Sequence, residues 1–272
     1  MKYKAIFSDF DGTLYGTDYT VSQKNRDAIK NYISLGGKFY ISTGRLFKSI
    51  YPHLVDLDLE GYVVTSQGAE VYDIKSKNLV HGEYISRDTT IKSLEFIEKQ
   101  MHKKDIHYIA YQANEIISSE RNSYADRLCN IVKIDYKITN EKLSSYFSHQ
   151  EIMPSKILAL MDMSLMDEFV KEGEKELKDV NFAKSREFLV EIQAKDIDKG
   201  KGVKKVCELE NISLSDIICI GDSENDLGML NVAGLSVATN NAYKHVKEKC
   251  KYIAPSCDED AIYDVIEKFC KE

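Results

Sequence analysis

The sequence lacks long hydrophobic runs and lacks the cysteine spacing of a metal or redox centre. No stretch approaches the ~18 apolar residues of a membrane span, and the apolar run at 5–7 is too short for a signal peptide. No two cysteines form a C-x-x-C pair, so we expect reduced thiols in a reducing compartment. These absences predict a cytoplasmic protein with no membrane partner. The six cysteines are Cys129, Cys207, Cys219, Cys250, Cys257 and Cys270.

Concentrated positive charge is also scarce. The net charge is -7, and the densest basic group is Lys199, Lys201, Lys204 and Lys205. An acidic surface attracts polyanions poorly, so we expect no nucleic-acid partner. With 43% hydrophobic and 30% charged residues, the composition is typical of a globular protein rather than a disordered one. The 272 residues suggest one large or two ordinary domains, and a monomer is the default expectation.

Short apolar runs alternate with segments of helical periodicity in the first and last thirds of the chain. Strands bounded by helices in this way predict parallel βαβ units with helices on both faces of the sheet. We expect buried strands at 5–7, 39–41, 188–192, 217–220 and 235–238, and helices between Ser22 and Gly36, at 199–209, up to Leu230 and at 261–269.

The middle of the chain has a different pattern. The runs 62–65 and 71–74 predict a hairpin, and 156–161 predicts a strand. Ile91, Leu94, Ile97 and Met101 mark one face of a helix, and Ser164 is expected to open another. We therefore predict an α+β domain of residues 83–187, inserted into a core of residues 1–82 and 188–272.

The first candidate site follows the first strand, in the sequence Ser8-Asp9-Phe10-Asp11-Gly12-Thr13. In open α/β sheets the ligand crevice lies beyond the carboxyl ends of the strands. Two carboxylates there are costly unless a cation neutralises them, and Mg²⁺ prefers carboxylates, water and phosphate oxygens. A plain Asp-Gly turn with solvated carboxylates is the alternative. A calcium loop is excluded, because Leu14 and Thr20 stand where glycine and glutamate are required.

Two further candidates each permit an ordinary explanation. Ser42-Thr43-Gly44-Arg45 follows the second strand, where a hydroxyl and free backbone N–H groups can hold phosphate oxygens. Lys199 precedes Gly200 at the start of a helix, and its ammonium suits a phosphate oxygen. In isolation, the first motif is better explained as a plain turn with an N-cap, and the second as a solvated lysine.

A fourth acidic segment, Gly221-Asp222-Ser223-Glu224-Asn225-Asp226, follows the strand at 217–220. It also fails as a calcium loop, because Leu227 and Ala233 occupy the required glycine and glutamate positions. The four segments together are far more specific than any one, because a doubly wound sheet can bring four strand ends to one crevice. Neither a G-x-x-x-x-G-K-[ST] phosphate loop nor a G-x-S-x-G elbow is present.

On these four motifs the sequence resembles the haloacid dehalogenase (HAD) superfamily, in particular the Cof-like (subclass IIB) phosphatases. The resemblance runs from Met1 to the C-terminal helix, and Asn241-Ala242 resembles a further family pattern. It implies an α/β fold, with a Rossmann-like (HAD-like) parallel-sheet core and an inserted α/β cap domain that closes over the substrate.

The resemblance also implies a role for each motif residue. Asp9 would be the nucleophile that forms an aspartyl-phosphate, and Asp11 the general acid and base. Mg²⁺ would be held by Asp9, by the backbone carbonyl of Asp11 and by Asp222. The phosphoryl group would be bound by Ser42, Thr43, Gly44, Lys199 and Asn225, with Asp226, Asn241 and Arg45 in support.

The activity implied is hydrolysis of small phosphorylated metabolites such as sugar phosphates. Two alternatives stay open, a sugar phosphomutase on the same core and a non-catalytic phosphate-binding regulatory module. The substrate and the cap residues that select it cannot be inferred from the motifs. One departure concerns the pocket border, where many Cof-like members carry Asn-Gly-Ala and this chain has Gln67-Gly68-Ala69.

Overall fold

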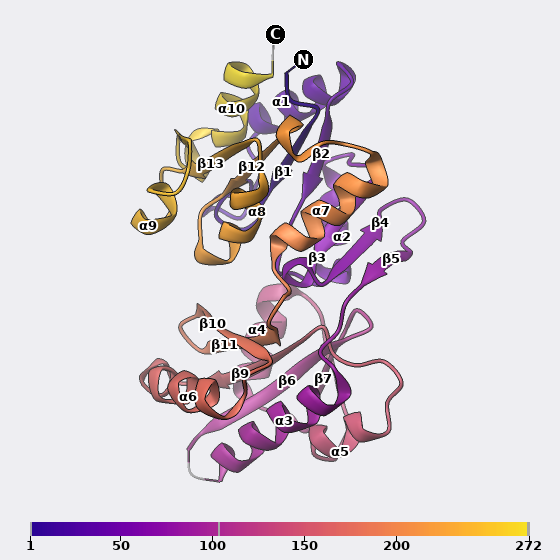
Figure 1. Cartoon of the computed structure of the whole chain (residues 1–272), viewed down its shortest axis with the longest axis vertical. Helices are drawn as coiled ribbons and strands as arrows, with labels where there is room; N and C mark the ends of the chain where they lie inside the picture. The colour runs from indigo at the N-terminus through magenta and orange to yellow at the C-terminus, as the bar shows by residue number, and fades with distance from the viewer. Residues whose placement is uncertain (1, 103, 271–272) are drawn as a thin grey trace. The chain divides into compact units, whose positions relative to one another are not determined.

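The computed structural model of the chain describes residues 2–102 and 104–270 (Figure 1). The chain divides into two compact units. The first, here called the core unit, contains the residues up to Gly44, Tyr51–His81 and the residues from Asp198 onward. The second, the inserted unit, contains Arg45–Ile50 and Gly82–Ile197.

The core unit is built on a five-stranded parallel sheet of order β14-β13-β12-β1-β2. Along the chain the strands extend from β1 to β2 on one side and then from β12 to β14 on the other. This order places a topological switch point beside β1, where open α/β sheets bind their ligands. The strands are β1 (Ala5–Ser8), β2 (Lys38–Ile41), β12 (Ile217–Gly221), β13 (Leu235–Thr239) and β14 (Tyr252–Ala254).

The helices of the core unit begin where the sequence supplies caps. The Ser22 side chain accepts a hydrogen bond from the backbone of Asn25, and the Asp198 side chain accepts one from Lys201. Val203 and Val206 then pack with β1 and β12 in one apolar core. The helices are α1 (Gln23–Ser34), α7 (Lys199–Glu210), α8 (Leu227–Val232), α9 (Lys244–Lys247) and α10 (Ala261–Phe269), and α2 (Phe47–Asp56) contributes residues to both units. Short 3₁₀ turns are η1 (Ser66–Gly68), η2 (Leu214–Asp216), η3 (Glu224–Asp226) and η4 (Cys257–Glu259).

A second, three-stranded sheet contains β3 (Tyr62–Thr65), β4 (Glu70–Asp73) and β5 (Leu79–Gly82). β3 and β4 pair antiparallel, which confirms the predicted hairpin. A parallel bridge joins Ser42 to Val64. The end of β3 therefore lies beside the residues that follow β2.

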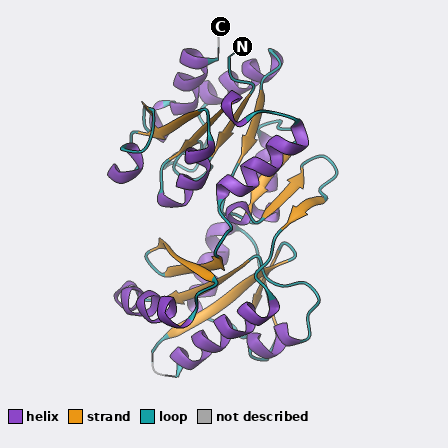
Figure 2. Cartoon of the chain, in the orientation of Figure 1, coloured by secondary structure: helices purple, strands orange, loops and turns teal. Residues whose placement is uncertain are grey.

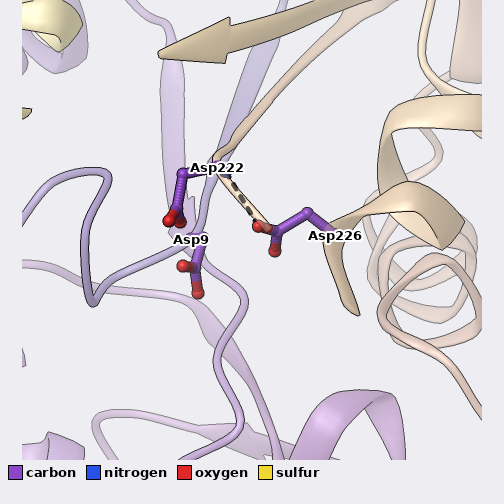
Figure 3. Close-up of side chains that lie close together, drawn as sticks. All are labelled: Asp9, Asp222 and Asp226. Carbon is purple, nitrogen blue, oxygen red and sulfur yellow. Dashed lines mark hydrogen bonds between the residues drawn. The ribbon is translucent and has the colours of Figure 1, made fainter. Parts of the chain in front are cut away.

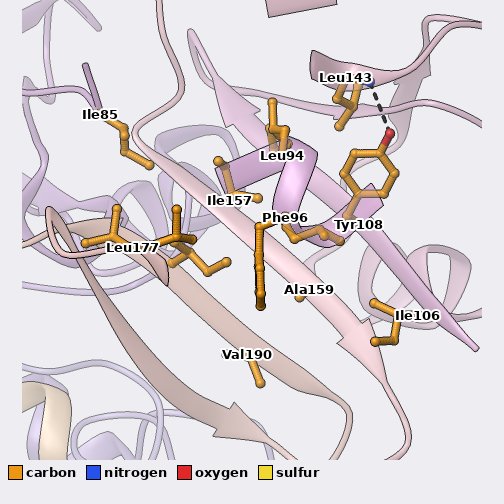
Figure 4. Close-up of a cluster of buried hydrophobic side chains, with 14 of the residues drawn as sticks. Ile85, Leu94, Phe96, Ile106, Tyr108, Leu143, Ile157, Ala159, Leu177 and Val190 are labelled. Carbon is orange, nitrogen blue, oxygen red and sulfur yellow. Dashed lines mark hydrogen bonds between the residues drawn. The ribbon is translucent and has the colours of Figure 1, made fainter. Parts of the chain in front are cut away.

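The inserted unit contains a six-stranded sheet of order β10-β11-β9-β6-β7-β8 (Figure 2). One apolar cluster joins Ile157 and Ala159 to Leu94 and Phe96 of α3 (Figure 4). A second cluster includes Leu158 and Leu160 with Leu128 of α4. Successive residues of β9 thus contribute to different clusters, as the alternation of side chains along a strand requires. The strands are β6 (Ile106–Gln112), β7 (Glu115–Ser118), β8 (Tyr136–Ile138), β9 (Lys156–Met161), β10 (Val180–Arg186) and β11 (Leu189–Ala194), and the helices are α3 (Arg87–Met101), α4 (Ser123–Val132), α5 (Leu143–Ser148) and α6 (Met163–Glu176).

The predicted limits of the insertion need correction. We expected a core strand at 188–192, but β11 pairs with β9 and β10 in the sheet of the inserted unit. That unit therefore ends at Ile197 rather than at 187, and it also includes Arg45–Ile50. A short run that is buried on both faces does not reveal which sheet it joins. Asp162 rather than Ser164 caps α6. None of the described helices has the length and apolar composition that a membrane crossing requires.

Candidate active site

The carboxyl ends of β1 and β12 bring two of the predicted motifs together. Ser8 is in register with Ile220, and the backbone N–H of Asp9 donates to the Ile220 carbonyl at 2.9 Å. Asp9 directly follows β1, and Asp222 directly follows β12. The parallel pairing of neighbouring strands therefore places both carboxylates at the switch point of the sheet.

Three carboxylates form a compact acidic group. Asp9, Asp222 and Asp226 each offer one oxygen, and these oxygens lie within 4.8 Å of one another. Figure 3 shows the three side chains converging from the two strand ends and from η3. Asp226 is fixed because its Oδ2 accepts hydrogen bonds from the backbone N–H groups of Asp222 and Ser223, both at 2.9 Å. An all-oxygen group of this kind suits a hard cation such as Mg²⁺.

Lys199 is the cation within this group. Its Nζ donates to Asp9 Oδ1 at 2.5 Å and to Asp226 Oδ1 at 2.6 Å, and its side chain is fully buried. It is the first residue of α7, so the Asp198 cap fixes its backbone. One ammonium opposite three carboxylates leaves a formal charge of about -2 when all are ionised, which a divalent cation would balance.

Burial and mutual repulsion shift the titration of this group. Burial raises the pKa of Asp9 well above its ordinary value, and Asp226 adds to the shift, whereas Lys199 opposes it. Burial, followed by the charge of Asp226, raises the pKa of Asp222 to about 6. Burial lowers the pKa of Lys199, but the attraction of Asp226 and Asp9 outweighs it, so that pKa is raised overall. Lys199 is therefore charged throughout the physiological range.

The turn after Asp9 is held from two sides. Gly12 has a φ of +82°, and a Cβ there would lie 2.9 Å from Asp222 Oδ2, so glycine is required on both counts. Thr13 Oγ1 donates to Asp222 Oδ1 at 3.1 Å, and Asn241 Nδ2 donates to the Gly12 carbonyl at 2.8 Å. Asn241 thus stabilises the loop that carries Asp11. We gave Thr13 no role from the sequence, although it ends the first motif.

The segment after β2 also reaches this edge of the sheet. The backbone N–H of Ser42 donates to Ser8, and that of Thr43 donates to Val64, both at 2.9 Å. Ser42 and Thr43 are both buried. The Ser42 hydroxyl has no hydrogen-bond partner within the described residues. Arg45, predicted as a supporting residue, is assigned to the inserted unit.

Asn225 lies in η3, next to the acidic group. Its Oδ1 accepts from Ser223 Oγ at 2.6 Å, and its Nδ2 donates to Gln67 Oε1 at 3.1 Å.

Of the residues predicted from the sequence, the structure brings Asp9, Lys199, Asp222 and Asp226 together in one group. The acidic group of these residues contains the carboxylate of Asp226 but not that of Asp11. For Asp11, the predicted metal ligand was the backbone carbonyl.

Comparison with known proteins identifies the family. The profile of the haloacid dehalogenase-like hydrolases matches residues 6–266. A relative from Bacillus subtilis (strain 168), the 5-amino-6-(5-phospho-D-ribitylamino)uracil phosphatase YwtE, is 26% identical over 280 residues, with 95% of each chain covered.

Solved structures share the fold along the whole chain. TM0651 from Thermotoga maritima superposes with a TM-score of 0.85 at 26% identity, covering 99% of this chain and 98% of that one. The HAD subclass IIB sugar phosphatase BT4131 superposes with a TM-score of 0.83 at 22% identity, covering 98% of both chains. The chain therefore belongs to the haloacid dehalogenase-like hydrolase family, within which it resembles the Cof-like, subclass IIB members, and it is an enzyme of the phosphatase class.

Proposed function

We propose that the chain hydrolyses phosphate monoesters of small metabolites with Mg²⁺, through a phosphoryl intermediate on Asp9. The observation that supports this most strongly is the buried contact of Asp9 with Lys199 inside the acidic group of Asp9, Asp222 and Asp226. A nucleophilic carboxylate, a fixed ammonium and an oxygen-rich cation site are the components that phosphoryl transfer requires.

The residues present fit a magnesium ion. Asp9 and Asp222 would hold it through carboxylate oxygens, together with the backbone carbonyl of Asp11. When bound, Mg²⁺ would balance negative charge on the carboxylates and on the phosphoryl oxygens. Asp226, whose two oxygens already accept from Lys199 and from backbone N–H groups, would orient its neighbours.

In the proposed reaction, a carboxylate oxygen of Asp9 forms a bond to phosphorus while the bond to the ester oxygen breaks. Asp11 donates its proton to that leaving oxygen. Asp11, now ionised, removes a proton from a water molecule, whose oxygen attacks phosphorus and releases Asp9. Lys199, Thr43 and the backbone near Gly44 would hold the phosphoryl oxygens throughout.

The raised pKa of Asp9 bears directly on this scheme. A protonated carboxyl group is a poor nucleophile, and burial favours that form. Lys199 acts in the opposite sense because it stabilises the ionised carboxylate at 2.5 Å. We therefore assign Lys199 two tasks, to favour the ionised form of Asp9 against the effect of burial and to bind the phosphoryl group of the substrate.

The substrate class is proposed from the names of the relatives. YwtE is named for a phosphorylated ribitylaminouracil, and BT4131 is named as a sugar phosphatase. A small phosphorylated metabolite, such as a sugar phosphate, fits both names. We propose that the inserted unit is the cap that selects the substrate. It was predicted as residues 83–187, and in the structure it contains Arg45–Ile50 and Gly82–Ile197.

The test is hydrolysis of p-nitrophenyl phosphate by the full chain, with Mg²⁺ and with EDTA. We expect turnover that requires Mg²⁺ and that falls by a factor of about 10³ or more in Asp9→Asn, because an amide cannot serve as the nucleophile. The matched control is Asp27→Asn, which changes an exposed aspartate on α1 and should leave the rate unchanged.

A panel of phosphometabolites should follow the generic ester. Absence of Mg²⁺-dependent turnover on both would overturn the phosphatase proposal. Turnover that requires a bisphosphorylated activator and yields an isomerised sugar phosphate would assign the chain as a phosphomutase instead.

A further inference from the structure

The turn after β3 has an unusual backbone. Its three residues are all left-handed, with φ of +51° at Ser66, +60° at Gln67 and +97° at Gly68. Glycine adopts this region readily, but serine and glutamine do so at a cost. Such residues persist where the surroundings fix them, and they cluster at functional sites. None of the four motifs of the sequence includes this turn.

The turn is held against two of the motif segments. The backbone N–H of Gln67 donates to the Thr43 carbonyl at 3.1 Å. At Gly68, a Cβ would come within 1.9 Å of the Asp198 carbonyl. The turn therefore packs tightly between the segment after β2 and the residue that caps α7.

The side chain of Gln67 spans the space between two motif segments. It is only 7% exposed, and its Oε1 accepts from Asn225 Nδ2 at 3.1 Å. On the other side, a Cβ on Gly44 would lie 2.5 Å from Gln67 Nε2. The absence of a side chain at Gly44 thus leaves room for the Gln67 amide.

Asn225 continues this contact toward the buried charges. Asn225 Oδ1 accepts from Ser223 Oγ at 2.6 Å, and Ser223 N–H donates to Asp226 Oδ2 at 2.9 Å. The other oxygen of Asp226 accepts from Lys199. A continuous series of hydrogen bonds therefore joins Gln67 to the ammonium beside Asp9.

We propose that Gln67 is a positioning residue of the phosphoryl site. Its amide holds Asn225 against the segment at Gly44, so the donors after β2 keep a fixed distance from the Asp226–Lys199 pair. The role depends on the length and the polarity of the side chain. This inference rests on the proposed function, because it concerns the geometry of the same site.

The experiment is a double-mutant cycle on the full chain with Gln67→Met, Asn225→Ala and the double variant. Methionine keeps the approximate volume of glutamine and removes the amide. The readouts are the affinity for inorganic phosphate with Mg²⁺, by isothermal titration calorimetry, and kcat and KM for p-nitrophenyl phosphate.

We expect Gln67→Met to weaken phosphate binding roughly tenfold and to raise KM more than it lowers kcat, because a positioning hydrogen bond is lost. The double variant should bind phosphate with an affinity no lower than that of the weaker-binding single variant, because both substitutions break the same contact. Gln67→Asn keeps the amide but shortens the side chain, so it should weaken phosphate binding as well.

The control is Gln100→Met, which removes another buried amide, one that donates to Glu172, and should leave phosphate affinity unchanged. The inference would be overturned if Gln67→Met binds phosphate within twofold of the wild type. It would also be overturned if the losses of phosphate affinity in the two single variants multiply in the double variant. If Gln67→Met does not fold, Gln67→Asn takes its place in the cycle. A wild type that binds phosphate without hydrolysing it overturns the proposed function alone, and the cycle then proceeds on phosphate affinity.

Discussion

The charged residues at the ends of β1 and β12 are unevenly balanced. Lys199 is buried between Asp9 and Asp226, and a buried ammonium is tolerated when carboxylates accept its hydrogen bonds. Asp222 adds a third carboxylate within reach of the other two. The metal-free site is therefore an unfavourable arrangement that the proposed Mg²⁺ would relieve.

This imbalance predicts how stability depends on pH in EDTA. The pKa of Asp222 is about 6 in the folded chain, above the value of about 3.9 for an unfolded aspartate. Between these values the folded state binds more protons, so stability rises as pH falls from about 7.5 to about 5. Over this range we expect a gain of about 1 kcal/mol, after an allowance for the partial exposure of Asp222.

The measurement is the thermal unfolding midpoint of the wild type and of Asp222→Asn in EDTA across this range. Asp222→Asn cannot titrate at this position and should be the more stable of the two at pH 7.5. The difference between the two midpoints should shrink as pH falls, because the wild-type carboxylate becomes protonated. Parallel curves for the two proteins would contradict the assignment.

The motif residues were predictable because their contacts follow from strand topology. Asp9 and Asp222 each follow a strand directly, and parallel strands end at one edge, so the sequence predicts that they meet. Gln67 and Thr13 were not predictable in this way. The partner of Gln67 is 158 positions away in the sequence, and its contact depends on a left-handed backbone that glutamine does not favour.

At the scale of elements, caps and breakers made the core helices easier to predict than the strands of the insertion. The closing helix at 261–269 has the predicted limits. Among the strands of the insertion, β9 at 156–161 is the exception that also has its predicted limits. We made no prediction for β6 or β7, which contribute to the apolar clusters of the inserted unit. A strand buried on both faces has no polar alternation, so its period is hidden.

The inserted sheet also carries a buried ion pair between two strands. Lys156 Nζ on β9 lies 3.0 Å from Glu191 Oε2 on β11, and the two side chains are 3% and 8% exposed. Lys156 Nζ also lies 4.8 Å from the centroid of the Tyr111 ring. Removing one buried partner leaves an uncompensated charge, whereas replacing both by apolar groups is often tolerated.

We therefore expect Lys156→Met to lower the free energy of unfolding by about 3–5 kcal/mol. The double variant Lys156→Met/Glu191→Met should recover most of that loss, because it removes both charges of the pair. Urea unfolding followed by circular dichroism measures both. Lys92→Met, which breaks an exposed pair with Asp88 on α3, is the control and should change the midpoint little. A double variant as unstable as the sum of its two single variants would contradict the prediction.

At the scale of the whole molecule, the chain passes repeatedly between two units that each have their own apolar core. Asp9, Lys199, Asp222 and Asp226 all belong to the core unit, although they come from distant parts of the sequence. A ligand held by these residues is therefore available only when the distant segments of the core unit are folded together. Binding and folding of the core unit should then be linked.

This linkage predicts where Mg²⁺ acts on stability. At a concentration of 100 times its Kd, a ligand that binds only the folded state adds about 2.7 kcal/mol. Amides of β1 and β12 that exchange only when the core unit unfolds should then exchange about 100-fold more slowly. Amides of β9 and β11 belong to the inserted unit and should exchange at the same rate with and without Mg²⁺.

Hydrogen exchange followed by mass spectrometry tests this prediction, with Mg²⁺ and with EDTA. Asp222→Asn should abolish the additional slowing of exchange that Mg²⁺ causes in β1 and β12. The substitution removes a proposed ligand and leaves both apolar cores intact. Equal protection of both units in the wild type would mean that the two unfold as one cooperative body. Protection that survives in Asp222→Asn would place the cation elsewhere, and the acidic group at the ends of β1 and β12 would then need a different explanation.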